Sequence, residues 1–130
     1  MLTSAAVIIY SERDEKFFFQ VRSDDPEIWW PGRLGCFGGA CEPFEKPATC
    51  LRRELNEELP NSFLSPLPLC VIQTDDRIRQ YYVAKVDHIV DYQVAEGDGG
   101  KWVSLQDISE LPRNSFVPMD IGVILHFFVD

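Results

Sequence analysis

The strongest constraint in this chain is a group of three glutamates, Glu54, Glu57 and Glu58, inside a stretch whose apolar residues recur at helical spacing. Residues at i, i+3 and i+4 lie on one face of an α-helix, so the three carboxylates share a face if the stretch is helical. The apolar residues that support a helix here are Ala48, Leu51, Leu55 and Leu59. The sequence therefore predicts a helix with a strongly acidic face.

This acidic face has two interpretations. Like charges at this spacing destabilise a helix by about 0.2–0.5 kcal/mol per pair, so they need either solvation or a partner. A solvated face is the simpler interpretation, and it is the commoner one for an isolated run of this kind. The alternative is a divalent cation, because Mg²⁺ takes oxygen ligands from carboxylates, substrate phosphates and water.

The residues around the glutamates resemble the Nudix box, G-x5-E-x7-R-E-U-x-E-E-x-G-U, where U is a bulky aliphatic residue. Two positions depart from this pattern, because Pro60 replaces the closing glycine and Asn61 replaces the final aliphatic residue. The positions that match in register are Gly39, Glu45, Arg53-Glu54-Leu55 and Glu57-Glu58. Segments outside the box are also similar to this family, namely Gln20-Val21-Arg22, Trp30-Pro31, Gly38-Gly39 and Lys101-Trp102-Val103.

The resemblance implies an α/β fold, specifically an α/β/α sandwich with a mixed β-sheet. It implies hydrolysis of a pyrophosphate bond in a small-molecule nucleoside diphosphate linked to another group, with Mg²⁺ or Mn²⁺ as cofactor. The chemistry agrees, because an acidic cluster repels an anionic phosphate unless cations bridge the two.

The resemblance also implies roles for residues of the box. The Gly39 carbonyl and the carboxylates of Glu54 and Glu58 are expected to bind the metal, with Glu57 as a further or water-mediated ligand. Arg53 is expected to assist the site by pairing with Glu45, which braces the preceding loop against the helix.

The general base has two candidates, Glu57 in the box and Glu96 in a later loop. Gly97, Gly99 and Gly100 follow Glu96 and predict a mobile surface loop that lets this carboxylate approach a site. A solvated loop carboxylate is the simpler interpretation of Glu96.

Two other functions stay open. The first is a catalytically silent Nudix-fold module that binds a nucleotide or a protein, for which Pro60 and Asn61 are the sequence support. The second is a different reaction on the same scaffold, such as isomerisation of an isoprenoid diphosphate. The intact glutamate pattern favours the hydrolase, because a binding module has no chemical need for three convergent carboxylates. The substrate is not disclosed, because pocket shape outside the box selects it.

Hydrophobic patterning and turn residues predict the remaining elements. Two β-hairpins, a short strand interrupted by Gly38-Gly39, a later strand, a helical turn and an apolar last helix are expected. Pro47 is expected to begin the central helix and Pro60 to stop it just after Glu58. The other ranges are 3–10 and 16–22 for the first hairpin, 34–41 for the interrupted strand, 67–73 and 78–86 for the second hairpin, 101–104, 105–111, and a helix from Pro118.

The loop over residues 23–33 holds the adjacent Trp29 and Trp30. We interpret them as anchors onto the core in preference to ligand contacts, although a nucleobase stacks well on such a ring. Arg22 and Arg33 near this loop are candidate phosphate contacts, as are Arg77 and Arg79, and Trp30 is a candidate substrate contact. For any one of these arginines a solvated surface cation is the simpler interpretation.

Length and charge limit the remaining choices. The 130 residues fit a single domain spanning 1–130. The formal charge of −9 argues against binding to a nucleic-acid polymer. No apolar run is long enough to cross a membrane and no leader pattern opens the chain, so we expect a cytoplasmic protein. The apolar last helix is expected to pack against the sheet or against a partner subunit in a homodimer.

The four cysteines, at positions 36, 41, 50 and 70, form no CxxC pair and have no histidine at ligand spacing. A zinc site is therefore not expected, and we interpret them as reduced, mostly buried small hydrophobes.

Overall fold

Strand β1, Leu2–Ser11, lies at the centre of the fold because its alternate side chains are buried in two different layers. Ala5, Val7 and Ile9 pack with side chains of helix α1, Pro47–Glu58. Ala6 and Ile8 pack with the helices on the opposite face. A strand that is buried on both faces is typical of a sheet covered by helices on each side. The structure, a computed structural model, describes residues 2–129.

The described residues form a seven-stranded mixed sheet. The antiparallel pairing of β1 with β2, Lys16–Val21, confirms the first predicted hairpin. The antiparallel pairing of β5, Leu67–Gln73, with β6, Arg77–Val86, confirms the second. Strand β1 also runs parallel to β6 along its whole length, which makes the sheet mixed. The strand order is β3-β2-β1-β6-β5, where β3 is Leu34–Gly35. Strand β4, Phe37–Ala40, pairs with β1, and β7, Gly100–Ser104, pairs with β2.

The segment predicted as one interrupted strand forms two strands that pair with different partners. Strand β3, Leu34–Gly35, pairs with β2, and β4, Phe37–Ala40, pairs with β1. The break falls at Cys36, because its N–H leaves the ladder and donates to the buried Asp120 carboxylate at 2.8 Å. The glycine pair lies inside β4, where a Cβ on Gly38 would meet the Ala5 carbonyl oxygen at 2.0 Å.

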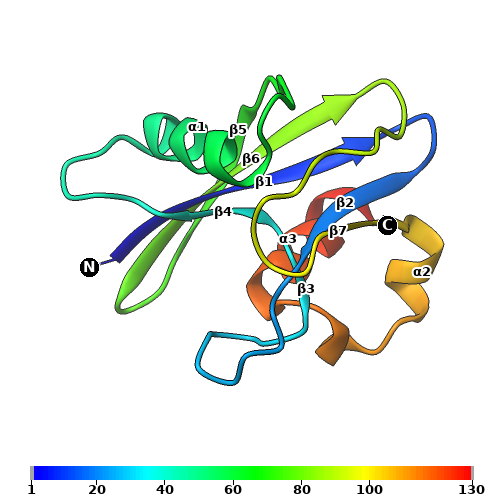
Figure 1. Ribbon diagram of the computed structural model, residues 1–130. Helices are drawn as coiled ribbons and strands as arrows, with labels where there is room; N and C mark the ends of the chain where they lie inside the picture. The colour runs from blue at the N-terminus through cyan, green and yellow to red at the C-terminus, as the bar shows by residue number, and fades with distance from the viewer. Residues whose placement is uncertain (1, 130) are drawn as a thin grey trace.

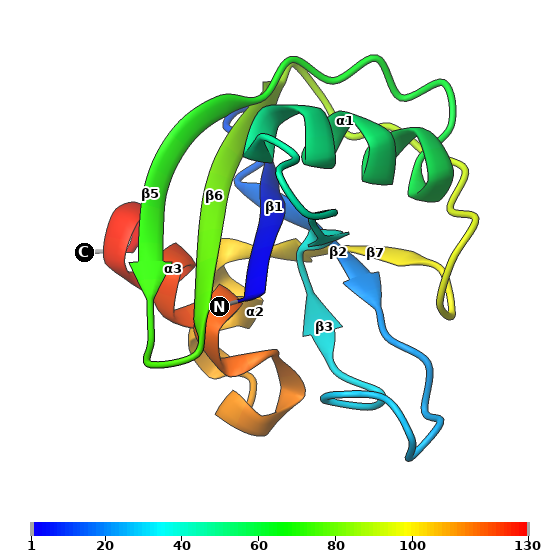
Figure 2. The ribbon, with the colours of Figure 1, turned by 90° about the vertical axis from the view of Figure 1, so that its left-hand side faces the viewer.

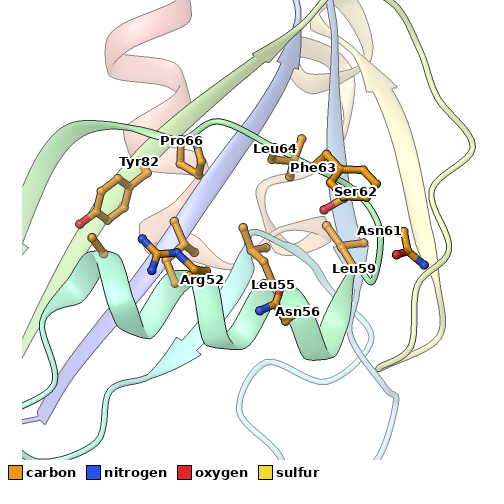
Figure 3. A pocket seen from close by; sticks show the side chains of 12 residues that line it. Arg52, Leu55, Asn56, Leu59, Asn61, Ser62, Phe63, Leu64, Pro66 and Tyr82 are labelled. Carbon is orange, nitrogen blue, oxygen red and sulfur yellow. The ribbon is translucent and has the colours of Figure 1, made fainter.

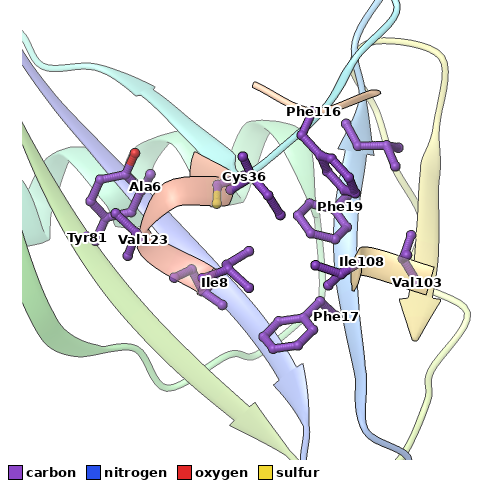
Figure 4. Packing of buried hydrophobic residues seen from close by; sticks show 13 residues of the cluster. Ala6, Ile8, Phe17, Phe19, Cys36, Tyr81, Val103, Ile108, Phe116 and Val123 are labelled. Atoms are coloured by element: carbon purple, nitrogen blue, oxygen red, sulfur yellow. The ribbon is translucent and has the colours of Figure 1, made fainter. Parts of the chain in front are cut away.

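Helices cover both faces of the sheet (Figure 1). Helix α1 lies on one face, and α2, Leu105–Glu110, and α3, Pro118–Phe128, lie on the other (Figure 2). The short 3₁₀ turn Arg113–Ser115 between α2 and α3 was not among the predicted elements. Aromatic side chains of β2 and the segment before α3 fill the core on the α3 side, among them Phe17, Phe19 and Phe116 (Figure 4).

The apolar last helix packs against the sheet. Ile121, Val123 and Ile124 are buried in the same cluster as Ala6 and Ile8 of β1. Within residues 2–129, no helix has both the length and the apolar character needed to cross a bilayer.

Helix α1 ends where the sequence predicts, but the turn that follows is made by Asn61. Leu59 N–H still donates to the Leu55 carbonyl at 2.8 Å, and Asn61 then has a φ of +62°. Asparagine tolerates this left-handed conformation better than most non-glycine residues. The left-handed residue therefore stands one position after the place where the Nudix box has its glycine.

Candidate active site

Helix α1 directs two of its glutamates into a cavity of about 420 Å³ at the edge of β4. Glu54 and Glu58 line it from α1, Gly38 and Gly39 from β4, and Glu96 from the loop before β7. Glu57 is not among the lining residues, and its side chain is 61% exposed. Of the three carboxylates on this helix, two therefore converge with Glu96 on one space.

Glu58 is the most buried of these acids, at 2% exposure. Its Oε1 accepts a hydrogen bond of 2.8 Å from the Gly38 N–H. Burial, together with the negative charges of Glu96 and Glu54, raises the pKa of Glu58 to about 8 against the lowering effect of that hydrogen bond. A carboxylate in this position is strongly disposed to take up a proton or a cation.

The Glu54 carboxylate packs directly on the backbone of Gly39. A Cβ at Gly39 would lie 2.6 Å from Cδ of Glu54, so only glycine lets this carboxylate occupy its position. Burial raises the pKa of Glu54, although the guanidinium of Arg53 lowers it. Strand β4 and helix α1 thus depend on each other for the geometry of the site.

Arg53 holds the loop before α1 against the helix. Its Nε and Nη2 donate to the two oxygens of Glu45 at 3.0 and 2.9 Å, and Nη2 also donates to the Ala40 carbonyl at 3.1 Å. The expected ion pair with Glu45 is therefore present, and these hydrogen bonds from Arg53 lower the pKa of Glu45 to about 2. Arg53 also donates to Glu54 Oε1 at 3.1 Å and so helps to fix the position of that carboxylate.

The loop that carries Glu96 is held at both ends by backbone hydrogen bonds, whereas its glycines predict a mobile segment. Ala95 N–H donates to the Glu58 carbonyl, and Asp98 N–H donates to the Val21 carbonyl, both at 2.9 Å. Gly97 between them has a φ of +74°, which lets the chain turn over Val21. These bonds position Glu96 over the cavity.

A second cavity of about 210 Å³ adjoins the first, and Arg22 lines both. Trp29 and Trp30 line the second cavity together with Arg77 and Arg79. The two tryptophans are 61% and 39% exposed, so their interpretation as core anchors is wrong. The loop contains two prolines and a glycine and runs over the surface, where one arginine lies over each ring, Arg77 over Trp29 and Arg33 over Trp30.

The arginines near this loop are fixed by it. Arg22 Nε donates to the Trp29 carbonyl at 2.7 Å, and Arg33 lies over the Trp30 ring at 4.9 Å. Arg33 also donates to the Phe116 carbonyl at 3.2 Å and does not line either cavity. Arg77 lies over the Trp29 ring at 4.6 Å. The second cavity is thus bordered by flat rings and guanidinium groups.

Sequence reasoning missed the buried acid at the base of the second cavity. Asp120 is 2% exposed and accepts hydrogen bonds from Cys36 N–H, Arg79 and the Tyr81 hydroxyl. The signal in the sequence was a single aspartate in an otherwise apolar helix. An aspartate is costly to bury unless it has hydrogen-bond partners such as these. Asp120 fixes the positions of Arg79 and of the β3–β4 break.

A third hollow, of about 300 Å³, lies on another face of α1, between Leu51, Leu55 and the segment 61–66 (Figure 3). Among residues 2–129 no carboxylate lines it, so it is separate from the acidic site.

The residues around the acidic cavity fit a divalent cation. The donors available there are carboxylate and carbonyl oxygens, which hard cations prefer, and the pKa of the buried Glu58 is raised by neighbouring negative charge that a cation would neutralise. Glu54, Glu58 and the Gly39 carbonyl are the residues that would hold it.

Comparison with known proteins assigns the family. The model of the NUDIX domain matches residues 1–120. The chain therefore belongs to the NUDIX domain family and is a Nudix hydrolase, a family whose cofactor is a divalent metal ion. No protein with curated annotation gives a match to the sequence.

Solved structures share the fold at low sequence identity. A MutT structure from work on Aliivibrio salmonicida and Vibrio cholerae is 22% identical, with a TM-score of 0.72 over 97% of this chain and 98% of that chain. The dihydroneopterin triphosphate pyrophosphohydrolase of E. coli is 16% identical, with a TM-score of 0.74 over 98% and 94%. The NUDIX domain of Shewanella oneidensis NrtR in complex with ADP ribose is 18% identical, with a TM-score of 0.76 over 95% and 84%.

Proposed function

We propose that this Nudix hydrolase cleaves the pyrophosphate bond of a nucleoside diphosphate linked to another group, with Mg²⁺ or Mn²⁺ as cofactor. The convergence of Glu54, Glu58 and Glu96 on one cavity beside Arg22 carries this proposal. When bound, the cation would neutralise the phosphate charge and acidify a water molecule.

The residues of this chain divide the remaining work. Glu54 and Glu58 offer their carboxylates and Gly39 its carbonyl for the metal, while Arg53 fixes Glu54 and the Glu45 loop. Arg22 stands where the two cavities meet, so its guanidinium can bind the phosphate that leads from one to the other.

Glu96 is the better of the two candidates for the general base. Its carboxylate borders the same cavity as Glu54 and Glu58, whereas the Glu57 side chain is largely in solvent and 3.9 Å from Arg53. A base must reach the water whose proton it takes, so geometry favours Glu96. Glu57 is left with an outer, water-mediated contact to the metal.

The second cavity is the place for the group attached to the phosphates. Trp29, Trp30 and Arg77 offer ring faces and a guanidinium to a planar base or a sugar. Arg33 acts on this cavity indirectly, since it supports Trp30 from outside.

The alternative function is a binding module that has lost hydrolysis. The NrtR domain is a Nudix fold described in complex with ADP ribose, which is the kind of ligand such a module would hold. For this chain the acidic cavity argues against loss of hydrolysis, because Pro60 and Asn61 end α1 without moving Glu54 or Glu58 away from it.

The test is a phosphate-release screen over nucleoside triphosphates, nucleotide sugars and dinucleoside polyphosphates, with Mg²⁺, with Mn²⁺ and with EDTA. We expect metal-dependent release from at least one class. Tight binding of a nucleotide without release under any metal condition would favour the binding module.

A further inference from the structure

Two of the four thiols meet where β4 ends and α1 begins. The Sγ atoms of Cys41 and Cys50 and a carboxylate oxygen of Glu45 all lie within 4.8 Å of one another. The other two cysteines stand elsewhere, Cys36 at the β3–β4 break and Cys70 on β5. No disulfide links any of the four, which are free thiols.

The paired thiols differ in their access to solvent. Cys41 follows the last residue of β4 and is partly exposed, whereas Cys50 lies in the first turns of α1 at 0% exposure. The Cys50 thiol points toward the Gly39 carbonyl at 3.6 Å. A dissolved oxidant can therefore reach the sulfur of Cys41, while the sulfur of Cys50 lies beside it in the protein interior.

The connection between the two cysteines is a short, outwardly turned loop (Figure 1). Phe44 at its tip is fully exposed and has a φ of +64°, a conformation that is costly for an aromatic residue. Arg53 holds this loop at Glu45, so the two sulfurs have to approach with that ion pair in place. The sulfurs must approach to about 2.05 Å to bond, which requires side-chain rotation and a small shift of these ends.

A soft metal ion is the competing occupant of this thiol pair, because Glu45 adds a third ligand. Both oxygens of Glu45 are already engaged, since Arg53 donates to each of them and the Glu42 N–H donates to Oε1. A cation would have to bind beside a guanidinium that is held there by two short hydrogen bonds. The observations therefore favour a bond between the sulfurs over a metal between them.

We propose that Cys41 and Cys50 are an oxidisable dithiol pair that forms a reversible disulfide when the protein meets a peroxide. Hydrogen peroxide oxidises the Cys41 thiol to a sulfenic acid and is itself reduced to water. The Cys50 sulfur then attacks the Cys41 sulfur, the S–O bond breaks, and the hydroxyl group leaves with the Cys50 proton as a second water. Two equivalents of a small thiol reverse the reaction by exchange.

The disulfide has a consequence that rests on the proposed hydrolysis. It removes the thiol that faces the Gly39 carbonyl, and it ties the end of β4 to α1 next to the backbone on which Glu54 packs. We therefore expect slower turnover in the oxidised form and full recovery after reduction.

Peptide mapping tests the pair independently of any activity. Hydrogen peroxide is added to the folded protein, free thiols are blocked with N-ethylmaleimide, and the chain is cut after glutamate. This cleavage separates Cys41, in residues 28–45, from Cys50, in residues 46–54, because the chain is cut after Glu45 but not after Glu42, which precedes Pro43. Trypsin leaves the two cysteines together because Lys46 precedes Pro47. We expect a linked pair of these fragments that dithiothreitol separates.

Two variants make the mapping specific. Cys41→Ala should lose the link and keep its turnover in peroxide, whereas Cys70→Ala should retain both the link and the sensitivity. Oxidation of Cys41 to sulfinic acid without a link would overturn the proposal. If stoichiometric Zn²⁺ protects both thiols from peroxide and no link forms after the Zn²⁺ is removed, the pair is a metal site and the proposed disulfide is wrong. A link that forms without any change in turnover would overturn the effect on hydrolysis alone.

Discussion

Glu96 and Glu57 are both carboxylates that could act as the general base, but of the two only Glu96 borders the cavity of Glu54 and Glu58. We predict that Glu96→Gln lowers kcat by about 10²–10⁴-fold, the usual cost of removing a general base. The Mg²⁺ concentration that half-saturates the enzyme should change little, because Glu96 is not assigned to the metal. Glu57→Gln is the matched control and should keep kcat within about tenfold. The reverse ranking of the two variants would assign the base to Glu57.

Glu58 makes the metal-free protein sensitive to pH. Its pKa is about 8 in the fold, against an ordinary value of 4.5, so the folded state keeps a proton that the unfolded chain has released. The stabilisation from that proton is fully present below about pH 4.5 and is lost as the pH rises through about 8. We predict that the Tm of wild type in EDTA falls across this window relative to that of Glu58→Gln.

The comparison needs melts of both proteins in EDTA at several pH values between 5 and 9. The difference between the two Tm values should grow with pH, and saturating Mg²⁺ should reduce it for wild type. A difference that is constant over this range would show that Glu58 has an ordinary pKa.

At the residue level, the sequence indicated the acids but not their surroundings. The spacing of Glu54 and Glu58 placed them one turn apart on α1, where they are found. Spacing alone could not show that Glu57 points into solvent while Glu54 and Glu58 line the cavity, because that difference depends on how β4 packs against α1. The partner of the Trp29 ring, Arg77, comes from β6 and therefore could not be read from the sequence of the loop.

The end of α1 depends on the left-handed turn at Asn61, whose φ is +62°. A β-branched residue is strongly disfavoured there, so we predict that Asn61→Val costs about 1–2 kcal/mol of unfolding free energy. Asn61→Gly should be close to neutral, since glycine adopts this conformation freely. Urea unfolding of the two variants measures the difference. Equal stabilities would mean that the turn relaxes without cost.

Elements that depend on residues near them in the sequence were predicted well, whereas features that depend on residues far along the chain were not. Hydrophobic patterning predicted both hairpins and β7. Patterning together with Pro47 and Pro118 predicted helices α1 and α3. The split between β3 and β4 was not predictable, because Cys36 leaves the ladder for a carboxylate 84 positions later in the chain. The tether of the Glu96 loop likewise depends on backbone groups of Glu58 and Val21.

Asp120 joins three parts of the molecule, because it accepts hydrogen bonds from the β3–β4 break and from Arg79 and Tyr81 on β6. Removing one partner of a buried ion pair leaves the other charge uncompensated. We predict that Asp120→Ala costs about 3–5 kcal/mol of unfolding free energy. Asp75→Ala, at an exposed position between β5 and β6, should cost far less. Urea unfolding measures the free energy of unfolding of both variants. Equal losses would show that the hydrogen bonds of Asp120 do not stabilise the fold.

At the scale of the whole molecule, the α/β/α sandwich was expected from the resemblance and is confirmed. Patterning gave the order of the elements along the chain but not the order of the strands in the sheet, since the parallel pairing of β1 with β6 joins residues 75 positions apart. The second cavity could not be foreseen for the same reason. Its lining comes from β1, the tryptophan loop, β6 and α3.

Glu54 and Glu58 are proposed to form one metal site, and the effect of Mg²⁺ on thermal stability tests whether they do. Binding to the folded state raises wild-type stability by about 2.7 kcal/mol at one hundred times the Kd. Glu54→Gln and Glu58→Gln should lose most of that gain together with turnover, and neither should be less stable than wild type in EDTA. Glu57→Gln should keep most of the gain. Retention of both the Mg²⁺-induced shift and full turnover by Glu54→Gln and Glu58→Gln would show that these two glutamates do not bind the metal.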